Sequence, residues 1–330
     1  MSVVAPGARP KSRAGVGARV RGTVPVSVLG VPIVVAAIVI VGTVLNRNFL
    51  TGANLRAILL SASITGIVAV SMTAITMSGN FVSLASSQSI MLAAILFAAA
   101  IGAGWNVTLA ILAVVAALVL TGFAQGLIIA AGLNPVITTL AAGAIIFGGV
   151  SAITGTNSVV FGAHHVSWSN SQPLGLPLPI YVFVAVTAIV SFLIHRTVIG
   201  RQVLLTGANR DAARVSGIPV RTVTTLAFVI FSVGTAIAGI LAVSLVGSAD
   251  PSFMGSLTVD AIAAVLIGGT SVAGGQGSPL RSAMGALILA LIDNIMVLNS
   301  VSIGGRQTIK GAVVVAVVIA ITLLGRKEAR

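Results

Sequence analysis

The chain has 330 residues, of which 57% are hydrophobic and 7% are charged. A soluble domain carries about 25% charged residues, so the composition excludes a water-covered globular surface and predicts a membrane protein. The net charge of +13 does not indicate nucleic-acid binding, because five of the 18 basic residues lie in the first 21 positions and none lies between Ala57 and His195. The absence of cysteine excludes disulfide and thiolate chemistry.

The apolar segments are long and do not alternate with polar residues, which predicts helices rather than barrel strands. Residues 1–23 are polar and basic and are expected to form a disordered cytoplasmic tail, and residues 24–330 form the transmembrane domain. We expect an all-α polytopic membrane protein with about ten transmembrane helices. The predicted spans are 25–45, 57–77, 86–104, 107–130, 135–154, 179–195, 223–246, 258–274, 282–299 and 308–325.

Glycine, serine and asparagine interrupt the apolar runs at 78–131 and 255–282, where broken or re-entrant helices also fit. With the N-terminus inside, 14 basic residues fall on the cytoplasmic side, five of them in the loop 196–222. The outer side receives four, namely Arg47, Arg56, Arg306 and Lys310. This asymmetry predicts an even number of spans with both termini cytoplasmic.

Catalytic and cofactor motifs are missing from the sequence. There is no phosphate loop and no H-E-x-x-H motif, so we expect no catalytic residue and no enzymatic activity. The His164-His165 pair lacks carboxylate or thiol partners nearby, so no metal site is expected. The glycine-rich run 268–277 contains no lysine, and Gly268 and Gly269 are interpreted as structural or gating residues at a helix end or a close helix contact.

The loop 207–218 is the most informative stretch. Asn209 can cap a short helix with Asp211 in its first turn, and Gly217 can end it. A helix of about two turns is unstable alone in water, so it needs a partner surface. Helical spacing places Arg210 and Arg214 on one face. The residues alone leave two interpretations open, a solvated loop near lipid headgroups and a docking helix for a cytoplasmic protein.

This stretch, Gly-Ala-Asn-Arg-Asp-Ala-Ala-Arg-Val-Ser-Gly-Ile, resembles the cytoplasmic coupling segment of the ribose/xylose-type ABC permeases, whose pattern is Gly-Gly-Asn-x-x-Ala-Ala-Arg-x-Ser-Gly-Ile. Four further segments are similar to that family: 49–55 to the start of its second span, 134–140 to its Pro-x-Ile-x-Thr-Leu segment, 260–271 to its Asp-Ala-Ile-Ala-Ala-Val-x-x-Gly-Gly-Thr-Ser run, and 309–311 to its last span. The matches follow the family order over residues 46–325.

The resemblance implies an importer permease of the bacterial inner membrane that pairs with a second permease copy or a paralogue. ATPase subunits would dock on the coupling helix and carry the ATP and magnesium, so that this chain itself binds no cofactor. A periplasmic solute-binding protein would deliver a small polar solute, usually a monosaccharide. The coupling residues implied here are Asn209, Arg210, Asp211, Ala212, Ala213, Arg214, Ser216 and Gly217.

The chain departs from the family pattern at three places that bear on the solute. Phe81 stands in the segment 78–85 where the family has an acidic residue. Thr258 replaces a frequent glutamate, and Ile295 replaces a usual glycine. Because acidic groups are natural partners of sugar hydroxyls, these changes leave the substrate class open.

Polar residues within the predicted spans are candidates for the solute path. A charged residue at a helix centre costs about 2.5–3.5 kcal/mol on insertion scales, so Asp293 indicates either an ion pair between helices or contact with a solute. Asp260 lies where a helix dipole favours an acid, and it is interpreted, like Gly268 and Gly269, as a structural or gating residue. The candidate path residues are Asn80, Asn134, Thr138, Asn294 and Asp293, although Asn134 precedes Pro135 and is equally well explained as a helix cap.

Two alternatives to a sugar importer remain at this point. An ion-coupled secondary transporter would need coupling carboxylates in its spans, where only Asp260 and Asp293 qualify. An ABC permease for amino acids or another non-sugar solute would need a charged pair along its path to bind a zwitterion, and the sequence offers no good candidate for that pair.

Overall fold

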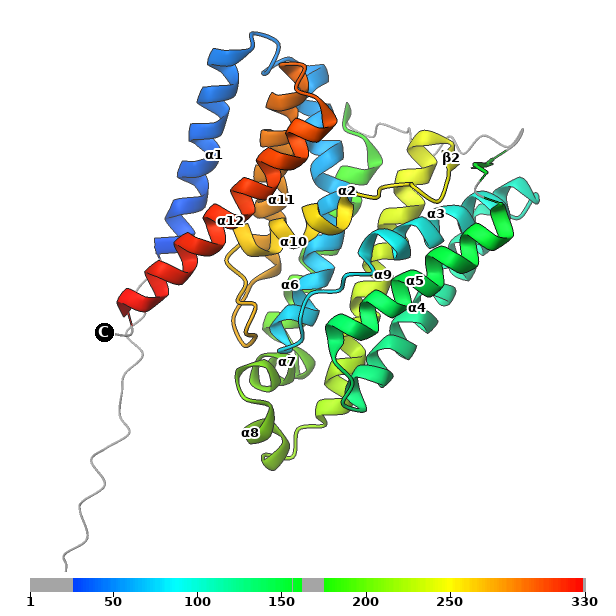
Figure 1. Cartoon of the computed structure of the whole chain (residues 1–330), viewed down its shortest axis with the longest axis vertical. Helices are drawn as coiled ribbons and strands as arrows, with labels where there is room; N and C mark the ends of the chain where they lie inside the picture. The colour runs from blue at the N-terminus through cyan, green and yellow to red at the C-terminus, as the bar shows by residue number, and fades with distance from the viewer. Residues whose placement is uncertain (1–25, 156, 162–174, 329–330) are drawn as a thin grey trace, which may run out of the picture.

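The computed structural model describes residues 26–155, 157–161 and 175–328 (Figure 1). The predicted tail 1–23 and the His164-His165 pair lie outside the described residues. The helices are α1 (Val26–Leu45), α2 (Gly52–Met77), α3 (Ser86–Gly102), α4 (Val107–Ala130), α5 (Pro135–Thr154), α6 (Leu178–Arg196), α7 (Val198–Ala208), α8 (Arg210–Val215), α9 (Val220–Val246), α10 (Leu257–Ile267), α11 (Pro279–Leu298) and α12 (Ile303–Glu328).

Two short strands join distant parts of the chain at the end opposite α8 (Figure 1). Strand β1 (Val159–Val160) pairs antiparallel with β2 (Ser248–Ala249), with Val159 opposite Ala249. This pairing ties the segment after α5 to the end of α9, and Gly247 allows the turn between α9 and β2 because its φ is 83°.

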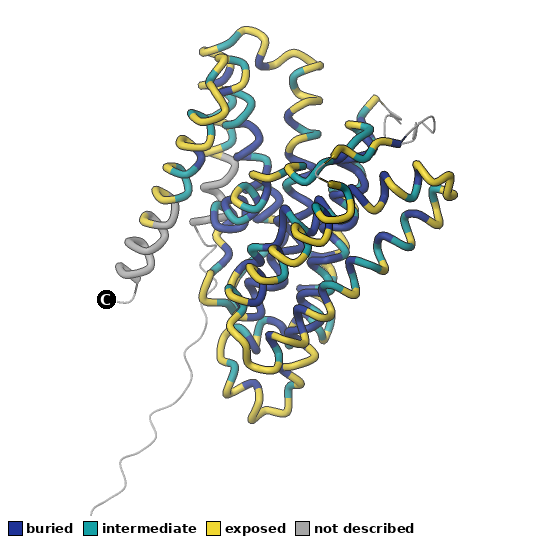
Figure 2. The backbone as a smooth tube through the Cα atoms, turned by 45° about the vertical axis from the view of Figure 1, so that its right-hand side comes forward, coloured by how far each residue is buried: buried dark blue, intermediate teal, exposed yellow. Residues whose placement is uncertain are grey.

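The long helices α2 and α9 form the centre of the fold and pack against each other. Helices α3, α4 and α5 lie on one side of this pair and α6, α10 and α11 on the other, with α1 and α12 outermost (Figure 1). Large apolar side chains such as Met72, Phe228 and Phe231 fill the contact between them. Figure 2 accordingly shows buried backbone gathered in the middle of the molecule.

The outer helices expose apolar side chains along most of their length. On α4 and α5, Leu120 is 67% exposed, Ile145 74% and Ile153 88%. Six helices in the described part are long and apolar enough to cross a membrane, namely α2, α4, α5, α6, α9 and α11. An apolar surface of this extent suits lipid, where it costs no hydration. The prediction of an all-α membrane protein is therefore confirmed.

Most predicted spans agree with helices, and α4 and α5 match their predictions to the residue. The span predicted at 258–274 is wrong as a continuous helix, because α10 ends at Ile267. Its 11 residues reach about 16 Å, roughly half of the hydrocarbon core. Positive φ angles at Gly269, Gly274 and Gly275 turn the chain through the irregular segment 268–278 instead.

The segment 78–85 is the second break, as the interrupted sequence there allowed. Helix α2 ends at Met77, the chain turns at Gly79 with φ of 77°, and α3 begins only at Ser86. The polar residues of this break are buried in protein: Ser78, Asn80 and Ser83 are no more than 1% exposed. Irregular backbone is tolerated at membrane depth under this condition. The segment 268–278 is less covered, because Thr270 is buried but Val272 is 42% exposed.

Candidate functional site

The short helix predicted within 207–218 is present as α8. The Asn209 side-chain oxygen accepts a hydrogen bond from the Ala212 backbone N–H at 2.9 Å, which caps the helix. Asp211 lies in the first turn, and Gly217 follows the helix with φ of 80°. The prediction of a single loop over 196–222 is incomplete, because this stretch also contains α7. Thr197 caps α7 by accepting a hydrogen bond from the Gly200 N–H at 3.2 Å.

The two arginines of α8 have different surroundings despite their shared helical face. Arg210 points into the protein, where its Nη2 donates to Asn80 Oδ1 at 3.0 Å and to Thr224 Oγ1 at 3.2 Å. Burial lowers the pKa of the Arg210 guanidinium, the charge of Arg214 lowers it further, and Asp211 opposes the shift. Arg214 is 70% exposed and lies 3.9 Å from the exposed Asp211. Arg210 therefore anchors α8, while Arg214 is available to a partner.

Three chain segments meet through backbone contact beside α8. We call this contact the glycine junction; it comprises Gly79 after α2, Gly207 near the end of α7, and Gly274 and Gly275 in the segment 268–278. The Gly275 N–H donates to the Met77 carbonyl at 3.0 Å. A Cβ atom on Gly207 would lie 1.9 Å from the Met77 oxygen and 2.5 Å from the Gly275 nitrogen.

Sequence analysis did not predict the glycine junction. Each of the three segments contains one or two glycines, but no local sequence pattern indicates that the segments contact one another. Only glycine allows this approach, because any larger residue would place a carbon atom inside the neighbouring backbone. The junction therefore fixes the end of α7, and α8 after it, against both broken segments of the fold.

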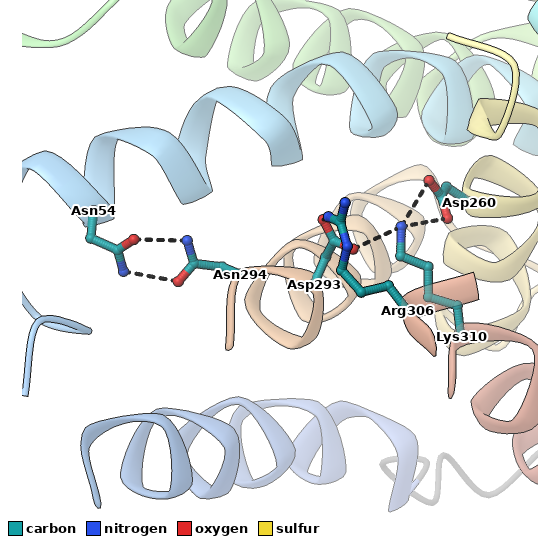
Figure 3. Close-up of polar contacts among 6 residues, drawn as sticks. All are labelled: Asn54, Asp260, Asp293, Asn294, Arg306 and Lys310. Carbon is teal, nitrogen blue, oxygen red and sulfur yellow. Dashed lines mark hydrogen bonds and ion pairs between the residues drawn. The ribbon is translucent and has the colours of Figure 1, made fainter. Parts of the chain in front are cut away.

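Four charged side chains from three helices form a charged cluster (Figure 3). Lys310 on α12 lies between two carboxylates, with Nζ 3.1 Å from Asp260 Oδ1 and 3.0 Å from Asp293 Oδ1. Arg306, one helical turn away, lies 3.4 Å from Asp293 Oδ2. Lys310 is only 9% exposed. Two positive and two negative charges neutralise one another here, which offsets part of the cost of placing them in a membrane helix bundle.

The charged cluster gives the predicted acidic residues their partners. Asp260 lies in the first turn of α10 as expected, and Asp293 forms ion pairs between helices, one of its two predicted arrangements. Arg306 and Lys310 were predicted only as outer-side charges, and their pairing with the two acids was not predicted. Their spacing of four residues was the available signal, since it places both on one face of a helix.

The predicted path residues do not meet within one chain. Asn80 lies beside α8, bonded to Arg210. Asn134 caps α5 by accepting from the Val136 N–H at 2.9 Å, and Thr138 is buried one turn further along. Asn294 on α11 exchanges two hydrogen bonds with Asn54 on α2, at 2.9 and 2.8 Å (Figure 3). Their proposed contact with a solute remains a prediction.

The glycines predicted to be structural or gating residues follow the C-terminal end of α10. A Cβ on Gly268 would lie 2.6 Å from the Arg281 carbonyl oxygen of α11, and Gly269 has φ of 71°. Close packing between α10 and α11 therefore explains Gly268, and the turn out of α10 explains Gly269. Their gating role stays a prediction.

Comparison with known proteins places the chain among transport proteins. The family model described as "Branched-chain amino acid transport system / permease component" matches residues 54–323. The chain is 32% identical to the ribose import permease protein RbsC of Escherichia coli (strain K12), over 86% of this chain and 89% of the relative. It is 31% identical to the Bacillus subtilis RbsC, over 88% of this chain and 90% of the relative.

A third relative has a different named solute. The autoinducer 2 import system permease protein LsrD of Yersinia enterocolitica is 30% identical, over 77% of this chain and 79% of the relative. No solved structure matches the chain significantly.

Proposed function

The chain belongs to the family of branched-chain amino acid transport system permease components, and on that premise we propose that it is the transmembrane subunit of a bacterial ABC importer for a monosaccharide or similar small polar solute. Its similar relatives are named as permeases for ribose and autoinducer 2 import. It is a transport subunit of the cell membrane rather than an enzyme. ATP and magnesium belong to partner ATPase subunits, and a solute-binding protein delivers the solute.

The observation that carries the proposal is the construction of α8. The helix is too short to persist alone, yet it is capped by Asn209 and anchored through Arg210 to Asn80 and Thr224. Its outer side presents Asp211 and Arg214, whose side chains are 94% and 70% exposed. An exposed ion pair contributes little to stability, so these charges are better explained by docking an ATPase subunit.

The proposal includes ten spans with both termini in the cytoplasm. The start of α1 and the end of α12 lie toward the same end of the molecule as α8 (Figure 1). Together with the excess of basic residues assigned to that side, this supports a position of α8 on the cytoplasmic side of the membrane. In this topology α10 and the segment 268–278 together make one span, of which only half is helical.

A second permease copy or paralogue completes the proposed importer. Helix α5 carries the predicted path residue Thr138, and Asn134 is its N-cap. The helix is poorly covered by its own chain, with Ile137 68% exposed and Ile145 74% exposed. Since Asn134 and Thr138 lie at the start of this outlying helix, a solute path that includes them needs a second chain opposite α5.

The alternative of an ion-coupled transporter receives no support from the charged cluster. Such a transporter needs a carboxylate that gains and loses a cation during transport. Asp260 and Asp293 are both paired with Lys310, a fixed cation of the chain itself.

The test is uptake into proteoliposomes that contain the chain, the ATPase and the binding protein encoded beside it. We expect ATP-dependent accumulation of D-ribose or another monosaccharide. Arg210→Ala and Arg214→Ala should lower uptake per ATP hydrolysed, whereas Arg47→Ala, an exposed charge at the opposite end, serves as the control. Uptake abolished by an uncoupler at constant ATP would support the secondary transporter, and uptake of L-leucine without any sugar would support an amino-acid permease.

Unchanged uptake and unchanged ATP hydrolysis in both α8 variants would remove the coupling assignment. A sugar importer would then remain, but with its ATPase docked elsewhere.

A further inference from the structure

A polar cavity of about 200 Å³ lies within this single chain, beside the charged cluster. Helices α2, α10, α11 and α12 and the residue before α10 contribute to its wall. Its polar lining residues are Ser61, Thr65, Ser256, Asp260, Asp293, Arg306, Gln307 and Lys310. Two larger cavities, between α2, α6 and α11 and between α4 and α5, are lined mainly by apolar side chains. The polar cavity thus differs from these lipid-facing grooves in chemistry.

The electrostatics of the cavity favour a neutral ligand. Its two carboxylates are balanced by one ammonium and one guanidinium group, at contact distances of 3.0 to 3.4 Å. A free cation or anion entering the cavity would compete with an existing ion pair and leave a buried charge unpaired, which is costly. A neutral polar molecule can instead bind beside the pairs without separating them.

The hydrogen-bonding groups of the cavity are only partly used by the protein. The Oδ1 atoms of Asp260 and Asp293 contact Lys310 as ion pairs but accept no hydrogen bond, and Arg306 Nε donates none, within the part of the chain that is described. Thr65 also lines the cavity. An ionised carboxylate has about four lone-pair positions and a guanidinium five N–H donors, so the cavity offers both acceptors and donors.

We infer that the polar cavity, whose described lining comes from this chain, is a binding site for a neutral polyhydroxylated molecule of monosaccharide size. Each hydroxyl group both donates and accepts, so vicinal hydroxyls match neighbouring carboxylate and cationic groups. The volume is below the roughly 300–1,000 Å³ of sites for drug-sized ligands, which suits a single sugar ring. The inference rests on the proposed function, and it assigns the solute a site lined by residues of this chain.

The way into the cavity passes exposed residues of two helices. Ser61 on α2 and Gln307 on α12 are exposed, whereas Lys310, one turn further along α12, is buried. In the proposed topology this opening faces the outer half of the membrane. A solute would therefore meet Gln307 first and the charged cluster afterwards.

The chain contains no cysteine, so a single introduced thiol reports on this opening without background. Gln307→Cys places a thiol at the opening, and Thr308→Cys, exposed but outside the cavity lining, is the matched control. The full chain in lipid nanodiscs is treated with a small water-soluble methanethiosulfonate, with and without D-ribose, D-xylose or D-glucose. At least one sugar should slow modification of Gln307→Cys, about threefold at twice its Kd, and leave Thr308→Cys unchanged.

Absence of protection by all three sugars would overturn the site, and so would equal slowing at both positions or protection by L-leucine alone. Absence of sugar uptake by the wild-type chain would instead count against the proposed function. Failure of the binding site and failure of the proposed function therefore give different results. A second variant, Thr65→Val, keeps the side-chain shape and removes one hydroxyl. It should raise the KM for sugar uptake severalfold with little change in kcat, whereas Thr43→Val on α1 should alter neither; equal kinetics for both variants would also overturn the site.

Discussion

Gly207→Ala is the sharpest test of the glycine junction. The new methyl group would lie 1.9 Å from the Met77 carbonyl oxygen and 2.5 Å from the Gly275 nitrogen. Both are backbone atoms, so the clash is not relieved by rotating a side chain. Overpacking of this kind costs about 1–3 kcal/mol, against which alanine gains at most about 1 kcal/mol in helix propensity. We expect a net loss of about 1–2 kcal/mol and a displacement of α7 from Met77.

The assay combines thermal unfolding of the purified chain with uptake and ATP hydrolysis in proteoliposomes. Gly207→Ala should lower the unfolding temperature by a few degrees and reduce the solute imported per ATP, because α8 follows α7 directly. The matched control is Gly52→Ala, which starts α2 and has no heavy atom within 4 Å of the new Cβ. If the two variants unfold at the same temperature and import equally per ATP, the backbone contact at the junction is not as close as described.

Three further variants test the polar contacts. Lys310→Met leaves two buried carboxylates without their shared cation and should lower the free energy of unfolding by about 3–5 kcal/mol; an unfolding temperature equal to the wild type would contradict the pairing. Asn294→Leu should cost about 1–3 kcal/mol by leaving Asn54 Oδ1 without its donor. Adding Asn54→Leu should restore part of that loss in a double-mutant cycle, although it also removes the bond from Asn54 Nδ2 to the Phe49 carbonyl. Asn80→Ala removes an acceptor of Arg210 and should reduce uptake per ATP while the chain still inserts; unchanged coupling would argue against this anchor.

Several features followed from the sequence because they depend on neighbours along the chain. The scarcity of charge and the length of apolar runs predicted the membrane class, and the bounds of α4 and α5 were correct to the residue. The cap at Asn209 and the stop at Gly217 predicted α8 because capping is a local interaction. The span predicted at 258–274 is longer than α10 because glycine and serine are common in membrane helices. Composition therefore does not distinguish a continuous helix from a broken span.

The functional geometry depended on contacts between distant residues. Lys310 reaches Asp260 across 50 positions, and Arg210 reaches Asn80 across 130. No periodicity or motif encodes such pairs, because they depend on which helix faces are brought together. The sequence by itself determined a membrane-embedded helical chain with a family-like α8 segment. Only the tertiary structure decided that its two intramembrane acids share one lysine and that three glycine-bearing segments meet beside α8, since packing, not local propensity, selects these neighbours.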